Sequence, residues 1–241
     1  MICATMAMFA MNDAVWAQEE NGDGDTKLSM SVDVASGFVW RGLANNMNPV
    51  VQPSITFKSG IFSIGTWAST PFISVWEPQE IDVFAEFEFS PSFKIGITDY
   101  FVYGSNIESS YFEYDKRKTC HALDLQFMYQ SAGGFNAMLS TIIAGDDIKY
   151  DNNFKAKSNL STYIELGYGS TFNDIDWEIC GGIVLMESGF YETEDFNIVN
   201  LGLGVTKNFV ITPTYSLPLS LKFTVNPAAK AAFLVASIAL F

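Results

Sequence analysis

Polar and apolar residues alternate with a period of two along most of the chain beyond its first 26 residues. The pattern is clearest in segments 29–41 and 80–89, and it recurs in 51–58, 160–169 and 175–183. In the first two segments the apolar members are Met30, Val32, Val34, Phe38, Trp40, Ile81, Val83, Ala85, Phe87 and Phe89. Alternation of this kind is typical of strands with one apolar and one polar face.

This pattern predicts twelve strands. We expect them at residues 28–41, 50–58, 61–69, 80–89, 93–103, 119–130, 135–145, 159–169, 175–186, 196–207, 214–225 and 230–241. The expected connections alternate between short turns and longer loops, and only the last, 226–229, breaks this pattern of length. The alternation places the two classes on opposite rims in bacterial outer-membrane barrels. An even number of strands then puts both chain termini on the periplasmic side.

A soluble β-sandwich would also show alternation, but its polar face meets bulk water and is usually rich in Lys and Thr. Here the polar positions carry carboxylates, Gly, Ser and Tyr, and the apolar positions contain almost no charge, as a lipid-facing surface requires. The chain also ends on Phe241, and a terminal aromatic residue is a familiar signal for outer-membrane assembly. The sequence therefore predicts an all-β protein, an antiparallel transmembrane β-barrel of about twelve strands in the bacterial outer membrane, with the sandwich as the alternative.

The composition narrows the class of protein further. Hydrophobic residues make up 49% of the 241 residues, yet no uninterrupted apolar stretch approaches the ~18 residues of a membrane-spanning helix. The chain has 27 acidic and 13 basic residues and a net charge of −14. A nucleic acid is therefore not expected as a partner, because binding to phosphates needs a basic surface.

The N-terminal segment has the composition of a targeting sequence. Residues 1–11 are apolar except for Thr5, and Val15-Trp16-Ala17 places modest or small side chains where a signal peptidase reads the chain. The basic residues that usually precede such a run are missing, which leaves open a true start further upstream. We expect a signal peptide at residues 1–17, an acidic periplasmic tail at 18–27 and the barrel at 28–241. Beyond this segment, Cys120 and Cys180 fall on predicted strands three apart in the sheet, so both are expected to be free thiols.

Several short stretches, in order along nearly the whole mature chain, resemble the TorF-type porin family. They are Ser31-Val32-Asp33, Phe38-Val39-Trp40-Arg41-Gly42, Pro49, Gln52-Pro53-Ser54, Gly65-Thr66-Trp67-Ala68-Ser69, Glu80-Ile81-Asp82, Gly96-Ile97-Thr98-Asp99-Tyr100, Thr162-Tyr163-Ile164-Glu165-Leu166-Gly167-Tyr168, Asn200-Leu201-Gly202-Leu203, Leu217-Pro218-Leu219 and Asn226-Pro227. The resemblance implies a small outer-membrane barrel. It brings no substrate, catalytic residue or cofactor with it.

If the apolar positions face lipid, the alternate positions line the lumen. The inward residues with charge are Asp33, Asp82, Glu86, Glu88, Asp124, Glu165, Asp176 and Glu178 against Arg41, Lys58, Lys94 and Lys222. Carboxylates in excess would favour cations in an open pore. The same residues could instead form ion pairs that plug a closed lumen, since twelve strands lie between the filled barrels of eight strands and the open barrels of sixteen. In either case Arg41 and Lys222 are the expected clamps, and Arg binds a carboxylate with two parallel hydrogen bonds.

Two further sets of residues, at inward and interfacial positions, are expected to have structural roles. Inward glycines, Gly182 among them, would make room for large inward neighbours such as Trp67 and Tyr163. Aromatic residues at the ends of strands would form the interfacial girdles of a barrel. The candidates for the girdles are Trp40, Trp76, Trp177 and Tyr168.

The residues that could support catalysis or metal binding form incomplete sets. His121 is predicted on the outer wall near the loop rim, where some outer-membrane lipases carry their catalytic histidine. No serine shares its face, and Asp99 is predicted to lie several residues too deep to orient it, so a nucleophile, base and orienting group do not come together. The loop with Asp146, Asp147 and Asp151 has no EF-hand spacing and is expected to be solvated. We therefore expect no enzymatic activity, metal or cofactor.

These observations lead to one favoured function and two alternatives. The favoured hypothesis is a narrow porin-like channel for small solutes with a weak cation preference. The alternatives are a closed-lumen barrel with a structural or adhesive role in the outer membrane and, with less support, a lipase-type enzyme. The expected partners are outer-membrane lipid and small solutes or ions.

Overall fold

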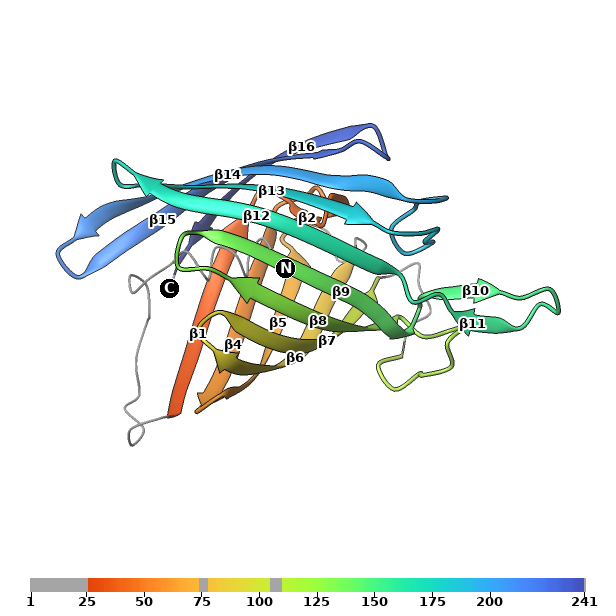
Figure 1. Cartoon of the computed structure of the whole chain (residues 1–241). Coiled ribbons are helices and arrows are strands. Elements are labelled where there is room, and N and C mark those ends of the chain that lie inside the picture. Colours follow the sequence, from red (N-terminus) through yellow and green to blue (C-terminus); the bar gives the residue numbers. More distant parts are fainter. Residues whose placement is uncertain (1–25, 74–77, 105–109, 241) are drawn as a thin grey trace.

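A computed structural model describes residues 26–73, 78–104 and 110–240, and in this part of the chain it shows a closed antiparallel barrel of twelve strands (Figure 1). The barrel strands are β1 (Thr26–Ala35), β4 (Val50–Ser59), β5 (Phe62–Pro71), β6 (Gln79–Ser90), β7 (Phe93–Tyr103), β8 (His121–Gln130), β9 (Phe135–Gly145), β12 (Thr162–Phe172), β13 (Ile175–Val184), β14 (Asn197–Thr212), β15 (Tyr215–Asn226) and β16 (Ala231–Ala239). Each strand pairs with its neighbour in sequence among these twelve, and β1 pairs with β16 to close the ring. The all-β fold class and the twelve-stranded barrel are thus confirmed.

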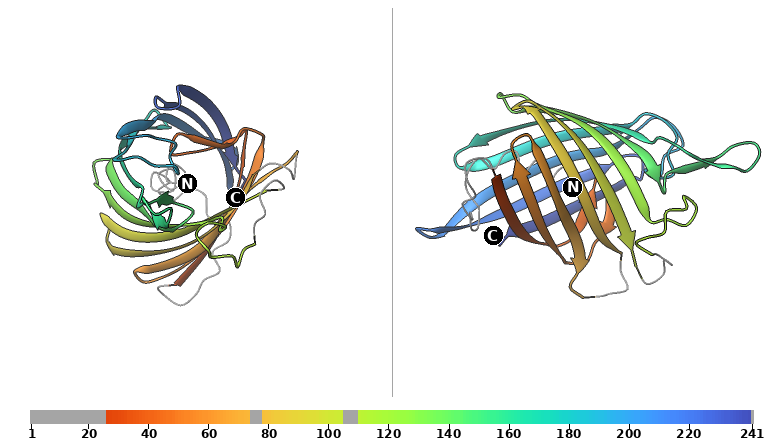
Figure 2. Two further views of the ribbon diagram at one scale, coloured as in Figure 1. Left: turned by 90° about the vertical axis from the view of Figure 1, so that its right-hand side faces the viewer. Right: turned by 90° about the horizontal axis from the view of Figure 1, so that it is seen from below.

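The two rims of the barrel differ as predicted. The short-turn rim carries connections of two to four residues, namely 60–61, 91–92, 131–134, 173–174 and 213–214. The long-loop rim carries the longer connections 36–49, 72–78, 104–120, 146–161 and 185–196, and also the four-residue connection 227–230, which is the predicted exception in length. Figure 2 (left) looks into the barrel from the long-loop rim, from which the hairpin of β10 (Ile148–Tyr150) and β11 (Ala156–Ser158) projects.

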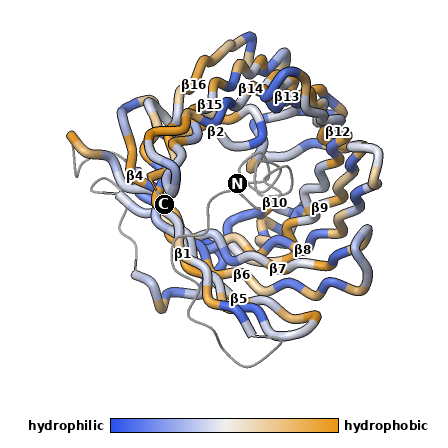
Figure 3. Tube along the Cα trace, turned by 90° about the vertical axis from the view of Figure 1, so that its left-hand side faces the viewer, coloured by the Kyte–Doolittle hydropathy of each residue, from blue (hydrophilic) through white to orange (hydrophobic). Residues whose placement is uncertain are grey.

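The first predicted strand, 28–41, was wrong in its second half. The wall strand β1 ends at Ala35, and the chain then turns into a small hairpin of β2 (Phe38–Trp40) and β3 (Leu43–Asn46). This plug hairpin lies within the ring of wall strands (Figure 3). Phe38 and Trp40 are therefore buried, at 7% and 4% exposure, and not on the outer surface as predicted. Alternation alone could not reveal this, because a hairpin inside the barrel has the same period as the wall.

The structure describes only part of the segments that were predicted at the N-terminus. The expected signal peptide, 1–17, lies outside the described residues, as do Trp76 and Phe241. β1 begins at Thr26, so the barrel includes the last two residues of the expected tail, 18–27.

The two faces of the wall have opposite character. Every barrel strand places at least one large apolar side chain on the outside with more than a third of its surface exposed. Examples in strand order are Met30, Phe57, Ile64, Val83, Phe93, Phe127, Leu139, Leu166, Ile179, Leu203, Phe223 and Leu234. The inward positions hold buried polar and aromatic side chains, among them Tyr100, Asp124, Gln126, Ser140, Tyr163, Glu165, Asn200 and Thr224. The predicted facing of the apolar positions is confirmed for these residues, and the alternation of hydropathy along the wall is visible in Figure 3.

The ring closes at a short seam. The pairs between β1 and β16 run only from Asp33–Ala239 to Ala35–Ser237, whereas all ten residues of β1 pair with β4. A backbone hydrogen bond at each end extends the seam, from Leu240 to Val32 (2.9 Å) and from Ser36 to Ala236 (2.8 Å). Among the described residues there is no helix long and apolar enough to cross a membrane.

Candidate functional site: the plugged lumen

The plug hairpin turns through Arg41 and Gly42, whose φ angles are 47° and 84°. Two successive residues with positive φ are what a two-residue type I′ hairpin turn requires. Gly42 also lies against β14, since a Cβ there would be 1.8 Å from the carbonyl oxygen of Val199. On the other side, the Asn226 amide donates a hydrogen bond to the Gly42 carbonyl (3.1 Å). The turn is therefore seated between the ends of β14 and β15 that lie at the long-loop rim.

The guanidinium of Arg41 crosses the lumen to the opposite wall. It donates to Asp124 on β8 (2.8 Å), to Ser140 on β9 (2.8 Å) and to the hydroxyl of Tyr191 in the 185–196 loop (2.5 Å). The Arg41 and Asp124 side chains are 1% and 0% exposed. Asp124 also accepts hydrogen bonds from Tyr100 (3.1 Å), Gln126 (2.9 Å) and Ser140 (2.6 Å). A buried ion pair offsets its desolvation only with such additional hydrogen bonds. Arg41 pairs with a lumen carboxylate as predicted, but through one nitrogen and not through two parallel hydrogen bonds, because its other terminal nitrogen donates to Ser140 and Tyr191.

Aromatic rings surround the guanidinium. The Arg41 Cζ atom lies 4.4 Å from the centre of the Trp40 ring and 4.9 Å from that of Tyr163, within the range of cation–π attraction. Tyr191 is stacked on Trp40 at 5.7 Å and on Tyr163 at 5.5 Å. Burial raises the pKa of Tyr191 well above its usual value, so this loop residue stays a neutral phenol. The hairpin and the 185–196 loop together fill this side of the lumen.

A second polar group lies beside this cluster. The Tyr163 hydroxyl donates a hydrogen bond to Glu165, and the Asn200 amide donates to the same carboxylate (2.8 Å). Gly182 makes room for Tyr163, because a Cβ at Gly182 would be 2.0 Å from the Tyr163 hydroxyl. The predicted role of this glycine is thus confirmed. Glu165 is fully buried, so it does not line an open pore in this structure.

The lumen toward the short-turn rim is less densely filled. Lys58 pairs with Glu88 (2.8 Å), and Lys94 lies 3.7 Å from Glu88 and 3.9 Å from Glu86. The side chains of these four residues are 19–44% exposed. The structure therefore divides the predicted lining into a dry half with Arg41 and Asp124 and a more accessible half with exposed ion pairs.

The remaining predicted lining residues are spread along the lumen. Lys222 lies 4.0 Å from Glu178, a looser contact than the clamp that was expected. Asp176 is near the short-turn rim, where it accepts a hydrogen bond from Thr171 (2.5 Å). Asp33 is half-buried beside the seam. Asp82 is fully buried, and neither carboxylate oxygen has a hydrogen-bond partner among the described residues.

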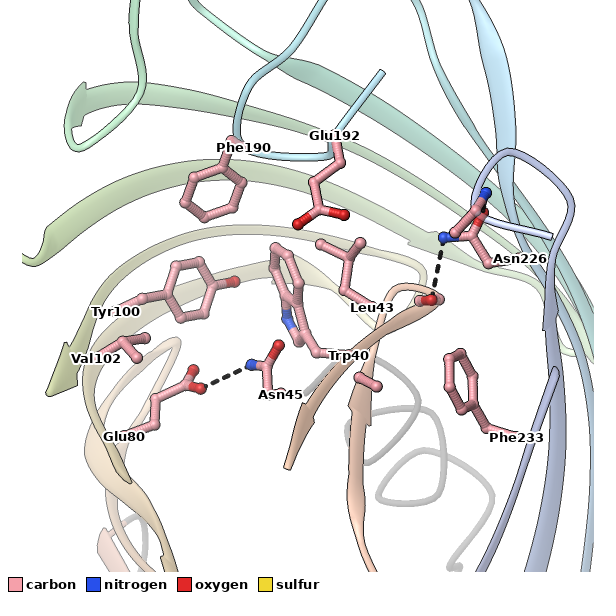
Figure 4. Close-up of a pocket in the computed structure, with 13 residues that line it drawn as sticks. Trp40, Leu43, Asn45, Glu80, Tyr100, Val102, Phe190, Glu192, Asn226 and Phe233 are labelled. Carbon is pink, nitrogen blue, oxygen red and sulfur yellow. Dashed lines mark hydrogen bonds between the residues drawn. The ribbon is translucent and has the colours of Figure 1, made fainter. Parts of the chain in front are cut away.

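A pocket of about 430 Å³ lies beside the plug hairpin (Figure 4). It is lined by Trp40, Gly42, Leu43, Ala44, Asn45, Glu80, Tyr100, Val102, Phe190, Glu192, Asn226, Ala229 and Phe233. The Asn45 amide donates a hydrogen bond to Glu80 (3.0 Å), which links the hairpin to β6 across the pocket. Glu80 was not among the predicted lining residues, although the alternation that places Asp82 inward also places Glu80 inward.

On the outer wall, the prediction for Asp99 was wrong. The Asp99 carboxylate lies 2.9 Å from Nδ1 of His121. The two residues are close because Asp99 pairs with Leu123, which is the next residue after His121 on the same face of β8. Nε2 of His121 lies 2.6 Å from the carbonyl oxygen of Tyr111, and the ring packs among Phe101, Tyr111 and Tyr114. Each ring nitrogen thus faces an acceptor oxygen, so neither is available to activate a nucleophile. His121 fastens the 104–120 loop to the wall.

The acidic loop and the cysteines show no metal-binding geometry. Asp147 turns inward and accepts hydrogen bonds from the Ser161 backbone (2.8 Å) and hydroxyl (2.6 Å). Asp151 lies in the turn of the β10–β11 hairpin, where hydrogen bonds from the Lys155 backbone and from Lys157 lower the pKa of its carboxyl group. In residues 26–73, 78–104 and 110–240, no three His, Cys, Asp or Glu side chains converge on a common point. Cys120 and Cys180 are free thiols, as predicted.

The fold and the lumen define the class of this protein as a twelve-stranded β-barrel with a plug hairpin and a polar, partly filled interior. The chain belongs to the family described as "Bacterial protein of unknown function (Gcw_chp)", whose model matches residues 19–237. No curated protein matches the sequence. A solved structure described as "Unveiling the Mechanism Behind the in-meso Crystallization of Membrane Proteins" is similar over 89% of this chain and 81% of the other, at 10% identity and a TM-score of 0.44.

Proposed function

We propose that this chain is a bacterial outer-membrane barrel that forms a narrow channel for small solutes with a weak cation preference. The observation that supports a membrane location is the outer face, where all twelve strands expose large apolar side chains. A soluble protein rarely exposes an apolar surface of that extent, whereas the lipid-facing band of an outer-membrane barrel requires it. The sequence resemblance to the TorF-type porins agrees with this proposal. No catalytic role is assigned to the lumen or to the outer wall.

The charge of the described lumen supports the cation preference. Its acidic side chains are Asp33, Glu80, Asp82, Glu86, Glu88, Asp124, Glu165, Asp176 and Glu178, and its basic side chains are Lys27, Arg41, Lys58, Lys94 and Lys222. Carboxylates in excess lower the barrier for positive ions. The exposed pairs in the short-turn half and the pocket beside the plug hairpin are the space that a small solute would use. The plug hairpin keeps this passage narrow.

A closed-lumen structural barrel is the second candidate, and the buried Arg41–Asp124 pair favours it. A plug held by an ion pair with 0–1% exposure would block passage rather than constrict it. The two candidates therefore differ in a single property, which is whether the wild-type protein conducts ions while the hairpin is in place.

Conductance of the refolded protein in a planar bilayer tests the proposal. We expect small, cation-selective steps for the wild type, and steps several-fold larger when residues 37–47 are replaced by a short Gly-Ser linker. Glu86→Gln and Glu178→Gln should each reduce the cation preference seen in the reversal potential across a salt gradient. Conductance only after removal of the hairpin would favour the closed barrel, and an anion preference would contradict the channel as proposed.

Location is tested separately by cell fractionation and by gel mobility. We expect the protein in the outer-membrane fraction, with a mobility that changes when the sample is heated. Recovery in the soluble periplasm would contradict a membrane barrel, whatever the conductance of the refolded protein.

A further inference from the structure

The pocket beside the plug hairpin has the size of a small-molecule site. Its volume of about 430 Å³ lies within the range of roughly 300–1,000 Å³ that is typical of such sites. Its walls come from the hairpin, the start of β6, the end of β7, the 185–196 loop, and the segment that runs from the end of β15 through the 227–230 connection to β16. Figure 4 shows Glu80 and Glu192 on different sides of Trp40 and Leu43.

The charged side chains that line this pocket, Glu80 and Glu192, are both acidic. Glu80 is 5% exposed and accepts a hydrogen bond from Asn45 (3.0 Å). Asp82 is the next inward residue on the same strand, is fully buried, and interacts with the Glu80 carboxyl group. None of the ion pairs between described residues involves Glu80, Asp82 or Glu192. A cleft whose charged lining residues are all acidic attracts cations rather than anions.

The remaining lining residues indicate which kind of cation fits. The pocket contains Trp40, Leu43, Tyr100, Phe190 and Phe233, which present hydrocarbon and aromatic surface next to the carboxylates. A metal ion would need several oxygen, nitrogen or sulfur ligands around one point, and the described residues provide no such group. A cation with its own hydrocarbon part matches both features, because its charge meets the carboxylate and its apolar part covers the aromatic rings.

We propose that this pocket binds a small organic ammonium ion, with the charged group at Glu80 and the hydrocarbon part against Tyr100, Phe190 and Phe233. This inference rests on the proposed function, because a solute must enter the lumen to reach the pocket, and it names the chemical class of that solute. Glu192, exposed on the 185–196 loop, lies at the pocket and provides a second carboxylate for attraction of the cation.

Titration calorimetry of the refolded full chain in detergent tests this directly. The probes are choline and its uncharged isostere 3,3-dimethylbutan-1-ol, which have nearly the same shape and differ in charge. We expect saturable binding of choline and at least tenfold weaker binding of the alcohol. Absence of saturable choline binding, or equal binding of the two probes, would overturn the proposal.

Two variants and one control locate the site. Glu80→Gln should weaken choline binding at least tenfold, while Glu88→Gln, which changes a lumen carboxylate far from the pocket lining, should leave it unchanged. Ala229→Lys, at an exposed lining position, should also weaken binding by placing a tethered ammonium group at the pocket, and it keeps the test valid if Glu80→Gln does not fold. Unchanged binding in a folded Glu80→Gln protein, or in Ala229→Lys, would refute the assignment. Choline binding is measured in detergent and conductance is measured in a bilayer, so a failure of the binding site can be distinguished from a failure of the proposed channel.

Discussion

At the scale of single residues, Arg41 has the largest influence on the lumen. Its side chain is almost fully buried, yet it contacts two wall strands and one loop through three oxygen acceptors and the sulfur of Met138. The cost of removing its charge from water is offset by an anion, two hydroxyl groups and two aromatic rings. A change of Arg41 removes a hydrogen-bond donor from Asp124, Ser140 and Tyr191 at the same time.

Arg41→Gln should destabilise the barrel by about 3–5 kcal/mol, because Asp124 would be left as a buried charge without its cation. Urea unfolding of the refolded protein in detergent measures the effect. Arg117→Gln is the matched control, since Arg117 pairs with Asp115 on the surface with 63% of its side chain exposed, and its loss should leave the stability nearly unchanged. Similar losses for both variants would show that the lumen pair is as well hydrated as the surface pair.

At the scale of elements, the plug hairpin depends on the fit of its turn against the wall. Its backbone pairing is internal, from Trp40–Leu43 to Phe38–Asn46. The turn packs against the backbone of β14 through Gly42 and Val199, and the Gly42 carbonyl accepts a hydrogen bond from the Asn226 side chain on β15. The hairpin is therefore positioned by contacts that leave no room for an additional carbon atom at the turn.

Gly42→Ala should displace the hairpin and destabilise the protein. The left-handed backbone alone costs roughly 1–2 kcal/mol for a residue with a Cβ, and the 1.8 Å approach to the Val199 carbonyl adds to this. Thermal unfolding of the refolded protein measures the loss, and single-channel recordings should show larger or noisier steps. Gly189→Ala is the control, since a Cβ at this exposed glycine meets nothing within 4 Å, and its effect should stay within about 0.5 kcal/mol.

At the scale of the whole molecule, the barrel separates an apolar exterior from a polar interior. Residues of one row around the wall, such as Ile179, Leu203, Phe223 and Leu234, pair directly across neighbouring strands and all point outward. The chain closes this cylinder through the short seam between β1 and β16. Two predictions follow at this scale, one for the outer face and one for the seam.

Val83→Arg and Leu203→Arg should each cost about 2–4 kcal/mol if these residues lie near the bilayer midplane, and less nearer the interfaces. Refolding into lipid vesicles at increasing denaturant concentration measures this cost. Ser63→Arg is the control, because Ser63 faces the lumen opposite Glu86 and a cation there meets carboxylates. Equal costs on both faces would contradict the assignment of the outer face to lipid.

Ala35→Cys combined with Ser237→Cys should form a disulfide across the seam. The two residues lie directly opposite each other on the antiparallel strands β1 and β16. The backbone hydrogen bonds at Val32 and Ser36 show that Ala35 and Ser237 form a non-hydrogen-bonded pair. In such pairs the Cα atoms are about 4.5 Å apart. In a background with Cys120 and Cys180 replaced by Ser, the oxidised variant should unfold at a higher temperature than the reduced one. Thiol titration checks formation of the bond, and free thiols in the folded, oxidised sample would contradict the register of the seam.

The sequence alone determined the wall of this barrel. Side-chain direction alternates with every residue of a strand, so the polarity pattern carries both the strand positions and their facing, and the predicted ranges 93–103 and 135–145 agree with β7 and β9 at both ends. The same local information placed Asp82, Asp124 and Glu165 in the lumen. Only the tertiary structure decided what fills that lumen. Arg41 meets Asp124 and Tyr191, which are 83 and 150 residues away, and no local pattern encodes contacts between residues so distant. The plug hairpin has the same period as a wall strand, so its place inside the ring follows from packing and charge pairing across the closed barrel.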